Sequence, residues 1–444
     1  MVRFIIILLS IYFLITSCFL FEDEQDDQNT NLTISLHSAG VTTVNLNVHP
    51  EDSLAQFTFE LTRDDSIVQT LSVLSDTIIK DTGLNPNTSY IYKGYWLNGT
   101  KRIGESDTLT VTTMDTTSHN FTWEIYTLGN GGTLRDVWIV DENDIWVVGD
   151  IITDSMEYNM AHWNGIKWVL MGLESQGDQI GQPGIDPIVY NYSSHTLDLN
   201  SIHYFNENDF WVTSGFPMHW NGESWTLFHL QNMGFSGVSV NTLWGTSSNN
   251  MYFVGYQGCI VHYNGNEFVK MNSPKAQTIN GITGSNSNET GDTQIWAWGW
   301  SDYPYRGFLL RSNGNIWEIV WDEFEPFFDD EACSTPTVWT NEEYFVSYTG
   351  CNWVSQISIH YIHDLTNYEV VHIDSVGYIY DIAGQNMNDL FFVGDFGNIM
   401  HFNGKTFRYF PELKLVWRWW GVDYIDDFVV IVASGGKIAI GQRQ

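Results

Sequence analysis

Basic residues are scarce in this sequence. It has 18 Lys and Arg against 53 Asp and Glu, which gives a formal net charge of −35 at pH 7. Binding of a nucleic-acid backbone requires clustered Lys and Arg, so this balance argues against a nucleic-acid partner. It also argues against docking on anionic lipid by charge alone. The excess of negative charge fits a soluble surface whose copies repel one another.

Charged residues of either sign are also few, at 16% of the chain, whereas aromatic residues are abundant. The sequence holds 20 Trp, 22 Tyr and 26 Phe, together with 38 Gly. Aromatic and β-branched residues favour strands, and glycine favours the turns between them. The composition therefore predicts an all-β protein, and 444 residues are enough for more than one domain.

Cysteine is rare, and the first of the 4 cysteines lies in an apparent export signal. Arg3 is followed by the apolar run FIIILLSIYFLI, which is short for a membrane span and suits the core of a signal peptide. The next residues, ITSC, resemble the bacterial lipobox, in which a cysteine receives lipid and becomes the mature N-terminus. The resemblance implies a lipoprotein signal peptide over 1–17 and lipidation of Cys18; an ordinary signal peptide with an incidental cysteine is the alternative. Residues 18–31, with EDEQDDQNTN, are expected to be an acidic flexible tether.

The remaining cysteines are Cys259, Cys333 and Cys351. Export permits a disulfide. Cys333 and Cys351 bracket one predicted hairpin, so they are the candidate disulfide pair. Cys259 precedes the apolar residues IVHY and is expected to be a buried thiol.

Residues 32–116 alternate apolar and polar side chains in short runs such as LTISL, FTFELT and YIYKGYWL. This pattern predicts a β-sandwich. The segment LNPNTSY fits L-x-P-x-T-x-Y and resembles the tyrosine corner of fibronectin type III domains, which implies that the Tyr90 hydroxyl bonds back to the backbone. The strand TVNLNV lacks the usual core Trp of that family, and Phe57, Phe59 or Trp96 would fill its volume. We expect a spacer domain, with ligand binding as the alternative.

A motif recurs in the rest of the chain: HWNGIKW begins at 162, HWNGESW at 219, HYNGNEF at 262, RSNGNIW at 311 and HFNGKTF at 401. Asn-Gly is a strong hairpin signal because both residues tolerate positive φ in a two-residue turn. A second hairpin with an acidic or Asn-rich tip precedes most copies, as in LRDVWIVDENDIWVVG. Two hairpins in each repeat of ~40–50 residues predict the four-stranded blades of a β-propeller over 119–444.

Repeats begin near 134, 199, 239, 278, 336, 378 and 416, which predicts seven blades, with six or eight left open by the irregular fifth repeat. The last repeat lacks a fourth strand. The segment at 121–128, FTWEIYTL, is expected to supply that strand and close the ring without an exposed edge. This region resembles a family of bacterial extracytoplasmic propellers with DDVWAVG…HWNG..W repeats. The resemblance implies the fold and no particular activity.

Repetition indicates that the motif residues are structural. His162, His219, His262 and His401 share one repeat position, so they lie in different blades and cannot reach one metal ion. Equivalent aromatic residues such as Trp168 are expected to pack between blades. No EF-hand loop, G-x-S-x-G, H-E-x-x-H or P-loop occurs in the sequence. We therefore predict no metal and no cofactor.

The connections at the two ends of each repeat differ in length. Tips within hairpins are short, whereas long segments occur in the other connections, at 150–160, 172–198, 299–307 and 321–333. In a propeller those connections open on one face, and loops on a rigid scaffold are where binding sites are usually built. The candidate ligand-binding residues in them are Tyr158, Tyr190, Tyr192, Trp300, Asp302, Tyr303, Tyr305 and Trp321.

We predict a monomeric protein, exported and lipid-anchored at the bacterial outer membrane or cell surface, whose loop face binds a protein or polysaccharide without catalysis. Loops that pack only on themselves are a second interpretation. The alternative function is a glycan hydrolase or lyase. It would use two carboxylates ~5–9.5 Å apart, from the set Asp302, Glu323, Glu325, Asp329 and Asp330.

Overall fold

The computed structural model describes residues 32–50, 57–73, 75–173, 187–188, 197–231, 233–286, 293–300, 307–322, 337–341, 344–350, 355–361, 364–373 and 377–444. The chain divides into two compact units, Met1–Asp115 and Thr116–Gln444. Apart from short 3-10 helices at Tyr256–Gly258 and Pro411–Leu413, the regular structure in the described residues is β-strand, which confirms the all-β prediction. Within these residues no helix is long and apolar enough to cross a membrane.

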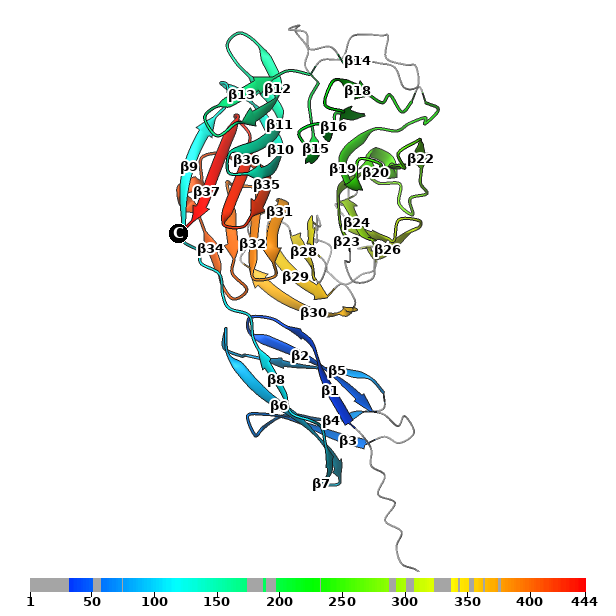
Figure 1. Ribbon diagram of the computed structural model, residues 1–444, viewed down its shortest axis with the longest axis vertical. Helices are drawn as coiled ribbons and strands as arrows, with labels where there is room; N and C mark the ends of the chain where they lie inside the picture. The colour runs from blue at the N-terminus through cyan, green and yellow to red at the C-terminus, as the bar shows by residue number, and fades with distance from the viewer. Residues whose placement is uncertain are drawn as a thin grey trace, which may run out of the picture. The chain divides into compact units, whose positions relative to one another are not determined.

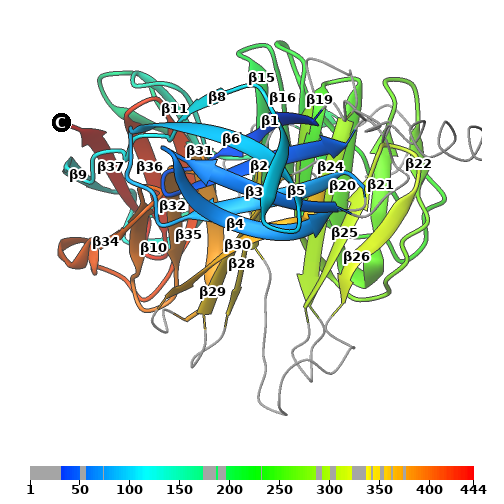
Figure 2. The ribbon, with the colours of Figure 1, turned by 90° about the horizontal axis from the view of Figure 1, so that it is seen from below.

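The first unit consists of two antiparallel sheets that share one hydrophobic core (Figures 1 and 2). One sheet contains β1 (Leu32–Ala39), β2 (Thr43–Pro50) and β5 (Thr77–Thr82). The other contains β4 (Ser66–Val73), β3 (Phe57–Arg63), β6 (Ser89–Asn98) and β7 (Lys101–Glu105), and β8 (Leu109–Thr112) pairs with the first half of β6. Side chains along β6 alternate between core and surface, as the apolar–polar alternation predicts.

Aromatic residues occupy the centre of this core. Phe59 on β3 and Trp96 on β6 are buried and meet edge to face, with ring centroids 6.3 Å apart. They are two of the three residues that were named as alternatives for filling the volume left by the missing Trp. The Tyr90 hydroxyl accepts a hydrogen bond of 2.9 Å from the backbone nitrogen of Asn85, which confirms the contact predicted for this residue.

The second unit consists of antiparallel sheets arranged around a ring, with the first strand of each sheet nearest the centre (Figure 1). The first sheet contains β10 (Gly131–Asp141), β11 (Asp144–Ile152), β12 (Glu157–Trp163) and β13 (Trp168–Met171). The next contains β15 (Ser201–Asn206), β16 (Asp209–Thr213), β17 (Pro217–Trp220) and β18 (Trp225–Leu227), to which β14 (Pro187–Ile188) is added. It is followed by β19 (Val240–Ser247), β20 (Asn250–Gly255), β21 (Ile260–Tyr263) and β22 (Phe268–Lys270).

Three further sheets follow in chain order. They contain β23 (Ile279–Asn286), β24 (Thr293–Trp300), β25 (Gly307–Ser312) and β26 (Trp317–Asp322); β27 (Thr337–Thr340), β28 (Tyr344–Gly350), β29 (Ser355–Tyr361) and β30 (Asp364–Ile373); and β31 (Ile379–Asn386), β32 (Asp389–Gly394), β33 (Ile399–Phe402) and β34 (Phe407–Tyr409). Each first strand contacts the first strand of the following sheet. The repeats identified in the sequence therefore correspond to successive sheets.

The last sheet combines the two ends of the unit. β35 (Trp419–Ile425), β36 (Phe428–Ala433) and β37 (Lys437–Arg443) are completed by β9 (Phe121–Thr127), which pairs antiparallel with β37. β35 in turn contacts β10 of the first sheet, so the order of the sheets returns to its start. The predicted pairing of the 121–128 segment with the final repeat is confirmed, and this pairing covers the edge of β37.

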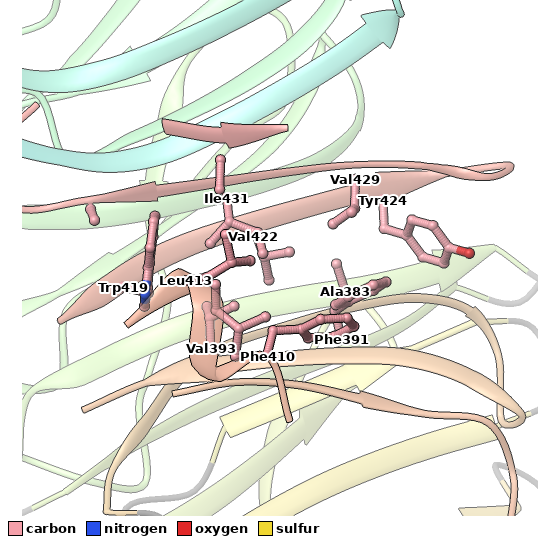
Figure 3. Close-up of a cluster of buried hydrophobic side chains, with 13 residues drawn as sticks. Ala383, Phe391, Val393, Phe410, Leu413, Trp419, Val422, Tyr424, Val429 and Ile431 are labelled. Atoms are coloured by element: carbon pink, nitrogen blue, oxygen red, sulfur yellow. The ribbon is translucent and has the colours of Figure 1, made fainter. Parts of the chain in front are cut away.

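Hydrophobic clusters lie between neighbouring sheets. Figure 3 shows one of them, in which Phe391 and Val393 of β32 pack with Val429 and Ile431 of β36. Similarly, Trp225 of β18 packs with Val148 and Met160 of the preceding sheet. The predicted role of the repeated outer-strand aromatic residues in packing between sheets is therefore confirmed, and each large ring buries extensive apolar surface.

The recurrent Asn-Gly pairs do not form the two-residue turns that we predicted. Trp163 pairs with Trp168, so residues 164–167 form a four-residue loop. Asn164 Oδ1 accepts hydrogen bonds of 3.1 Å from the backbone nitrogens of both Ile166 and Lys167. This side-chain capping stabilises the turn without a positive φ at the Asn. Only the glycine is left-handed, with φ 79° at Gly165, where a Cβ atom would lie 2.9 Å from Asn143 Oδ1.

Candidate functional site: the loop face of the propeller

The repeated histidines make one recurring contact inside their sheets. Each Nε2 bonds to the side-chain oxygen of an Asp or Asn at the start of the adjacent second strand: His162 with Asp144 at 2.7 Å, His219 with Asp209 at 2.8 Å, His262 with Asn250 at 2.7 Å and His401 with Asp389 at 2.8 Å. Each imidazole also packs on an aromatic ring of that strand, as His162 does on Trp146 with centroids 4.2 Å apart. The histidines are therefore scaffold residues, as predicted from their repetition.

One of these contacts extends to the next sheet. Ser248, at the tip between β19 and β20, accepts a hydrogen bond of 2.8 Å from Trp211 Nε1 and also bonds to Asp209 and His219. The network therefore ties two neighbouring sheets together. Among the described residues, no group of three or more His, Cys, Asp or Glu side chains is arranged to hold a metal ion.

A buried network fixes the closing sheet. Asp389 accepts hydrogen bonds from His401, from Arg443 on β37 and from Tyr424 on β35. Burial alone would raise the pKa of Asp389, but the bonds and charges of His401 and Arg443 hold it below its usual value. His119, just before β9, contacts His401 through their Nδ1 atoms at 2.7 Å. Burial and the neighbouring His401 lower the pKa of His119 to about 4, so the His119 imidazole is neutral at pH 7.

Three carboxylates link the first strands of consecutive sheets, and the sequence analysis did not single them out. Asp381 accepts the backbone N–H of Val422 at 2.9 Å, Asp423 that of Ile139 at 2.7 Å, and Asp136 that of Ile202 at 2.9 Å. The other oxygen of each carboxylate accepts the N–H of the next residue on its own strand. A possible signal was the Asp that recurs two residues after an apolar residue in LRDV and IYDI.

Removal from water dominates the pKa of these carboxyl groups. It raises the pKa of Asp136 and Asp423 to about 6, despite the hydrogen bonds from backbone N–H groups that favour the charged form. The pKa of Asp381 is raised well above its usual value by the same cause, and the charges of Asp136 and Asp423 add to the shift. Because all three carboxylates are engaged by backbone, we assign them to the scaffold.

Two kinds of connection open on one face of the ring, which we call the loop face. They are the turns between the second and third strands of a sheet and the connections from one sheet to the next. Three isolated bridges join the turn between the second and third strands of one sheet to the entry of the next sheet's first strand: Gly215 with Val240, Asp395 with Arg418, and Ser434 with Thr133. The hairpin tips lie at the opposite end of each sheet, where Gly165 approaches Asn143, Gly222 approaches Asn208 and Gly265 approaches Asn249. The face predicted to carry the long connections is therefore a single face in these sheets.

Two of the eight candidate residues have described side chains, and both lie beside this face. Tyr158 is the second residue of β12 and is half-buried. Its hydroxyl contacts Met156 Sδ at 3.4 Å. Trp300 is the half-buried last residue of β24, and Trp321 belongs to β26. The other candidates, Tyr190, Tyr192, Asp302, Tyr303 and Tyr305, lie outside the described residues.

Of the predicted cysteine residues, only Cys259 lies within the described residues. Cys18 and the pair Cys333 and Cys351 lie outside the described residues, as do the carboxylates Glu323, Glu325, Asp329 and Asp330 of the enzyme alternative. Cys259 is a buried free thiol, as predicted, and lies directly before β21. Burial raises its pKa to about 11, so it is unreactive at neutral pH.

A further aromatic group on the loop face escaped the sequence analysis. We call it the Trp417 patch; it consists of Tyr380, Phe396, Leu415, Trp417, Arg418 and Trp420. It forms where the β32–β33 turn meets the connection between β34 and β35, at the bridge from Asp395 to Arg418. The run VWRWWG, which covers the end of this connection and the start of β35, was the available signal. This connection was not among the long segments on which the prediction was based.

No family model and no curated protein matches the sequence. Several solved structures are similar. YCF48 bound to a D1 peptide is 13% identical, with 72% of this chain and 95% of that chain covered and a TM-score of 0.51. A catalytically inactive virginiamycin B lyase from Staphylococcus aureus with quinupristin is 9% identical, with 73% and 100% covered and a TM-score of 0.50. At these identities the likeness concerns the fold alone, and together with the ring of sheets it identifies a β-propeller in this chain.

Proposed function

We propose that this protein is a membrane-anchored extracytoplasmic binding protein whose propeller binds a protein or polysaccharide on the loop face. The observation that carries the proposal is the contrast between the two ends of the sheets. Hairpin tips such as 142–143, 164–167 and 207–208 are short and internally hydrogen-bonded, whereas the loop-face connections range from 214–216 to 172–200. Variable connections on a rigid scaffold are where binding residues are usually found.

We also infer the finer architecture. The sheets of the second unit would be the seven blades of one closed ring, in agreement with the repeat starts and with the contact from β35 back to β10. The first unit would be a fibronectin type III-like domain acting as a spacer. Its strand order and the hydrogen bond between Tyr90 and Asn85 support this assignment.

The proposed anchor is a lipid on Cys18, followed by the acidic tether to residue 31, at the outer membrane or cell surface. Its support is the ITSC motif after the apolar N-terminal run. Metabolic labelling with a fatty-acid analogue tests it on the full chain. Label on the wild-type protein and none on Cys18→Ala is the expected result; label retained by the variant would contradict lipidation at this residue.

Binding is tested with the full chain on a glycan array and against a displayed library of random peptides. Tyr158→Ala and Trp300→Ala alter the loop face, and each variant is first compared with wild type by thermal unfolding. Ile166→Ala and Ile316→Ala are matched controls, because these residues are 84% and 68% exposed on hairpin tips at the opposite end. We expect ligands that the loop-face variants bind more weakly and the controls bind normally. Equal losses in the controls, or no retained ligand, would overturn the proposal.

Fold alone does not choose between binding and catalysis, because one similar structure is bound to a peptide and another is a lyase. The carboxylates that a glycan hydrolase or lyase would use lie outside the described residues. In the part of the chain that the structure describes, the enclosed carboxylates Asp136, Asp381 and Asp423 are engaged by backbone N–H groups. We therefore favour binding as the function.

A further inference from the structure

We propose that the Trp417 patch is a docking site for a protein partner, and that the partner inserts a large apolar side chain from a segment without net negative charge. This inference rests on the proposed binding role of the loop face. It adds to the predicted loop residues a further part of that face that contacts the partner, and it names the class of molecule that is bound.

The patch exposes large apolar side chains that are close together in the chain. Trp417 is 64% exposed and Leu415, two residues before it, is 48% exposed. Phe396 meets Trp417 edge to face, with ring centroids 4.8 Å apart, and so supports the exposed indole from one side. Leaving this much apolar surface in water is unfavourable, and such groups on a soluble protein typically mark an interaction site.

The position of Phe396 has a conformational cost. Its φ is 58° and that of Gly397 is 70°, in a turn closed by a hydrogen bond of 3.1 Å from the Asn398 nitrogen to the Asp395 oxygen. Asn, Asp or Gly is the usual residue at the first central position of such a turn. A bulky residue is disfavoured in the left-handed region. Strain of this kind often accompanies functional sites, and here it places an aromatic ring beneath Trp417.

Arg418 adds hydrogen-bond donors next to this apolar surface. Its Nε donates to Asp395 Oδ1 at 2.9 Å, and its guanidinium lies 5.7 Å from the ring centroid of Tyr380 and 5.4 Å from that of Trp420. The side chain is nevertheless 43% exposed. The ion pair and the rings hold the guanidinium in place, so it can bind a main-chain carbonyl with little loss of conformational entropy.

Charge limits the choice of partner. Arg418 is paired with Asp395, and the nearby exposed Lys414 and Glu412 have opposite charges, so the patch itself is close to neutral. The whole chain carries −35 and repels polyanions at long range. These charges exclude an acidic polysaccharide or an acidic peptide as the favoured ligand.

A protein fits the remaining chemistry better than a neutral glycan. Trp, Tyr and Arg are the residues most enriched in the energetic centres of protein–protein interfaces. The exposed Leu415 beside Trp417 offers aliphatic surface with no hydrogen-bonding group for a sugar hydroxyl. An apolar side chain would pack against Leu415 and Trp417 while a carbonyl of the same segment accepts a hydrogen bond from Arg418.

The test measures binding of individual peptides, of about 12 residues each, enriched from a displayed random library on the full chain. We expect enriched peptides to contain Leu, Met, Phe or Trp and few Asp or Glu. Trp417→Ala should weaken their binding about tenfold or more. Arg418→Lys should weaken it less, because it retains the charge and loses the planar donor arrangement. Ile166→Ala is the control for loss of an exposed apolar side chain, and unchanged binding is expected. Thermal unfolding checks that each variant is folded.

The remaining outcomes separate this inference from the proposed function. Peptide binding that is lost in Tyr158→Ala or Trp300→Ala but kept in Trp417→Ala would overturn the Trp417 patch and leave the loop face as the binding surface. Binding of a neutral polysaccharide that depends on Trp417, without any enriched peptide, would overturn the protein partner alone. Peptide binding that none of these loop-face substitutions changes would overturn both proposals.

Discussion

Asp423 Oδ2 accepts a hydrogen bond of 2.7 Å from the backbone nitrogen of Ile139, which joins the last sheet of the propeller to the first. The first strand of each sheet is an edge strand, and its N–H groups on the central side have no neighbouring strand as a partner. An unpaired backbone group removed from water is costly. Asp423, Asp381 and Asp136 supply acceptors to these edges, and each connects two consecutive sheets.

Replacement of Asp423 by Asn should change how stability depends on pH. The folded-state pKa of about 6 lies above the usual value of a carboxyl group. The contribution of Asp423 is therefore full at pH values below its unfolded pKa and is lost as the pH rises through about 6. We expect the melting temperature of wild type to fall more steeply than that of Asp423→Asn between pH 4 and pH 7.

Thermal unfolding monitored by circular dichroism across that pH range measures the difference. Each kcal/mol lost should lower the melting temperature by about 2–4 °C. Glu142→Gln is the control, because Glu142 is exposed at a hairpin tip and its variant should keep the wild-type profile. Parallel profiles for wild type and Asp423→Asn would contradict the assignment.

Replacement of His219 by Ala should destabilise the propeller by about 1–3 kcal/mol. The change removes a partner of Asp209 and Ser248 and the ring that stacks on the buried Trp211, 4.3 Å away. Equilibrium unfolding in urea measures the loss. His219→Gln keeps a polar group at this position and should lose less. A chelator should leave the wild-type midpoint unchanged, whereas a shift would indicate a metal role for the histidines.

Replacement of Tyr90 by Phe should destabilise the first unit by about 1 kcal/mol. Only the hydroxyl that binds the Asn85 nitrogen is removed. Because the two units are separately compact, we expect the unfolding transition of the propeller to stay in place while that of the first unit moves to lower temperature in a calorimetric scan. Tyr95→Phe is the matched control, because its ring packs on Arg102, 3.7 Å from the centroid. An equal shift in both variants would contradict the role of the Tyr90 hydroxyl.

Replacement of Phe396 by Asn or by Ala should affect stability and peptide binding differently. Asn is favoured at this turn position, so Phe396→Asn should be about 1 kcal/mol more stable than Phe396→Ala. Both variants remove the ring that supports Trp417 and should bind the enriched peptides more weakly than wild type. Thermal unfolding and peptide titration measure the two effects. Equal stability of the Asn and Ala variants would show that the left-handed backbone at residue 396 carries no strain.

The strands and their order could be predicted from local patterns. Alternating side chains, apolar runs and Asn-Gly pairs recur at each repeat, and the missing fourth strand of the last repeat pointed to Phe121–Thr127. Repetition was also sufficient to classify His162 and Trp168 as scaffold, because equivalent positions in different sheets cannot converge. The turn type was mispredicted, because the capping of the Ile166 and Lys167 nitrogens by Asn164 competes with the expected two-residue turn.

The contacts between sheets join residues that are far apart in the chain, so no local sequence pattern predicts them. Asp136 and Ile202 are separated by 66 residues in the chain, and Phe396 meets Trp417 across two different connections. Their pairing follows from the rotation of one sheet relative to the next around the ring, which is set by how the buried side chains of neighbouring sheets pack. Composition and repetition were therefore sufficient for the class of fold and for the scaffold residues. The position of the Trp417 patch and the linked carboxylates of the central strands required the packed sheets.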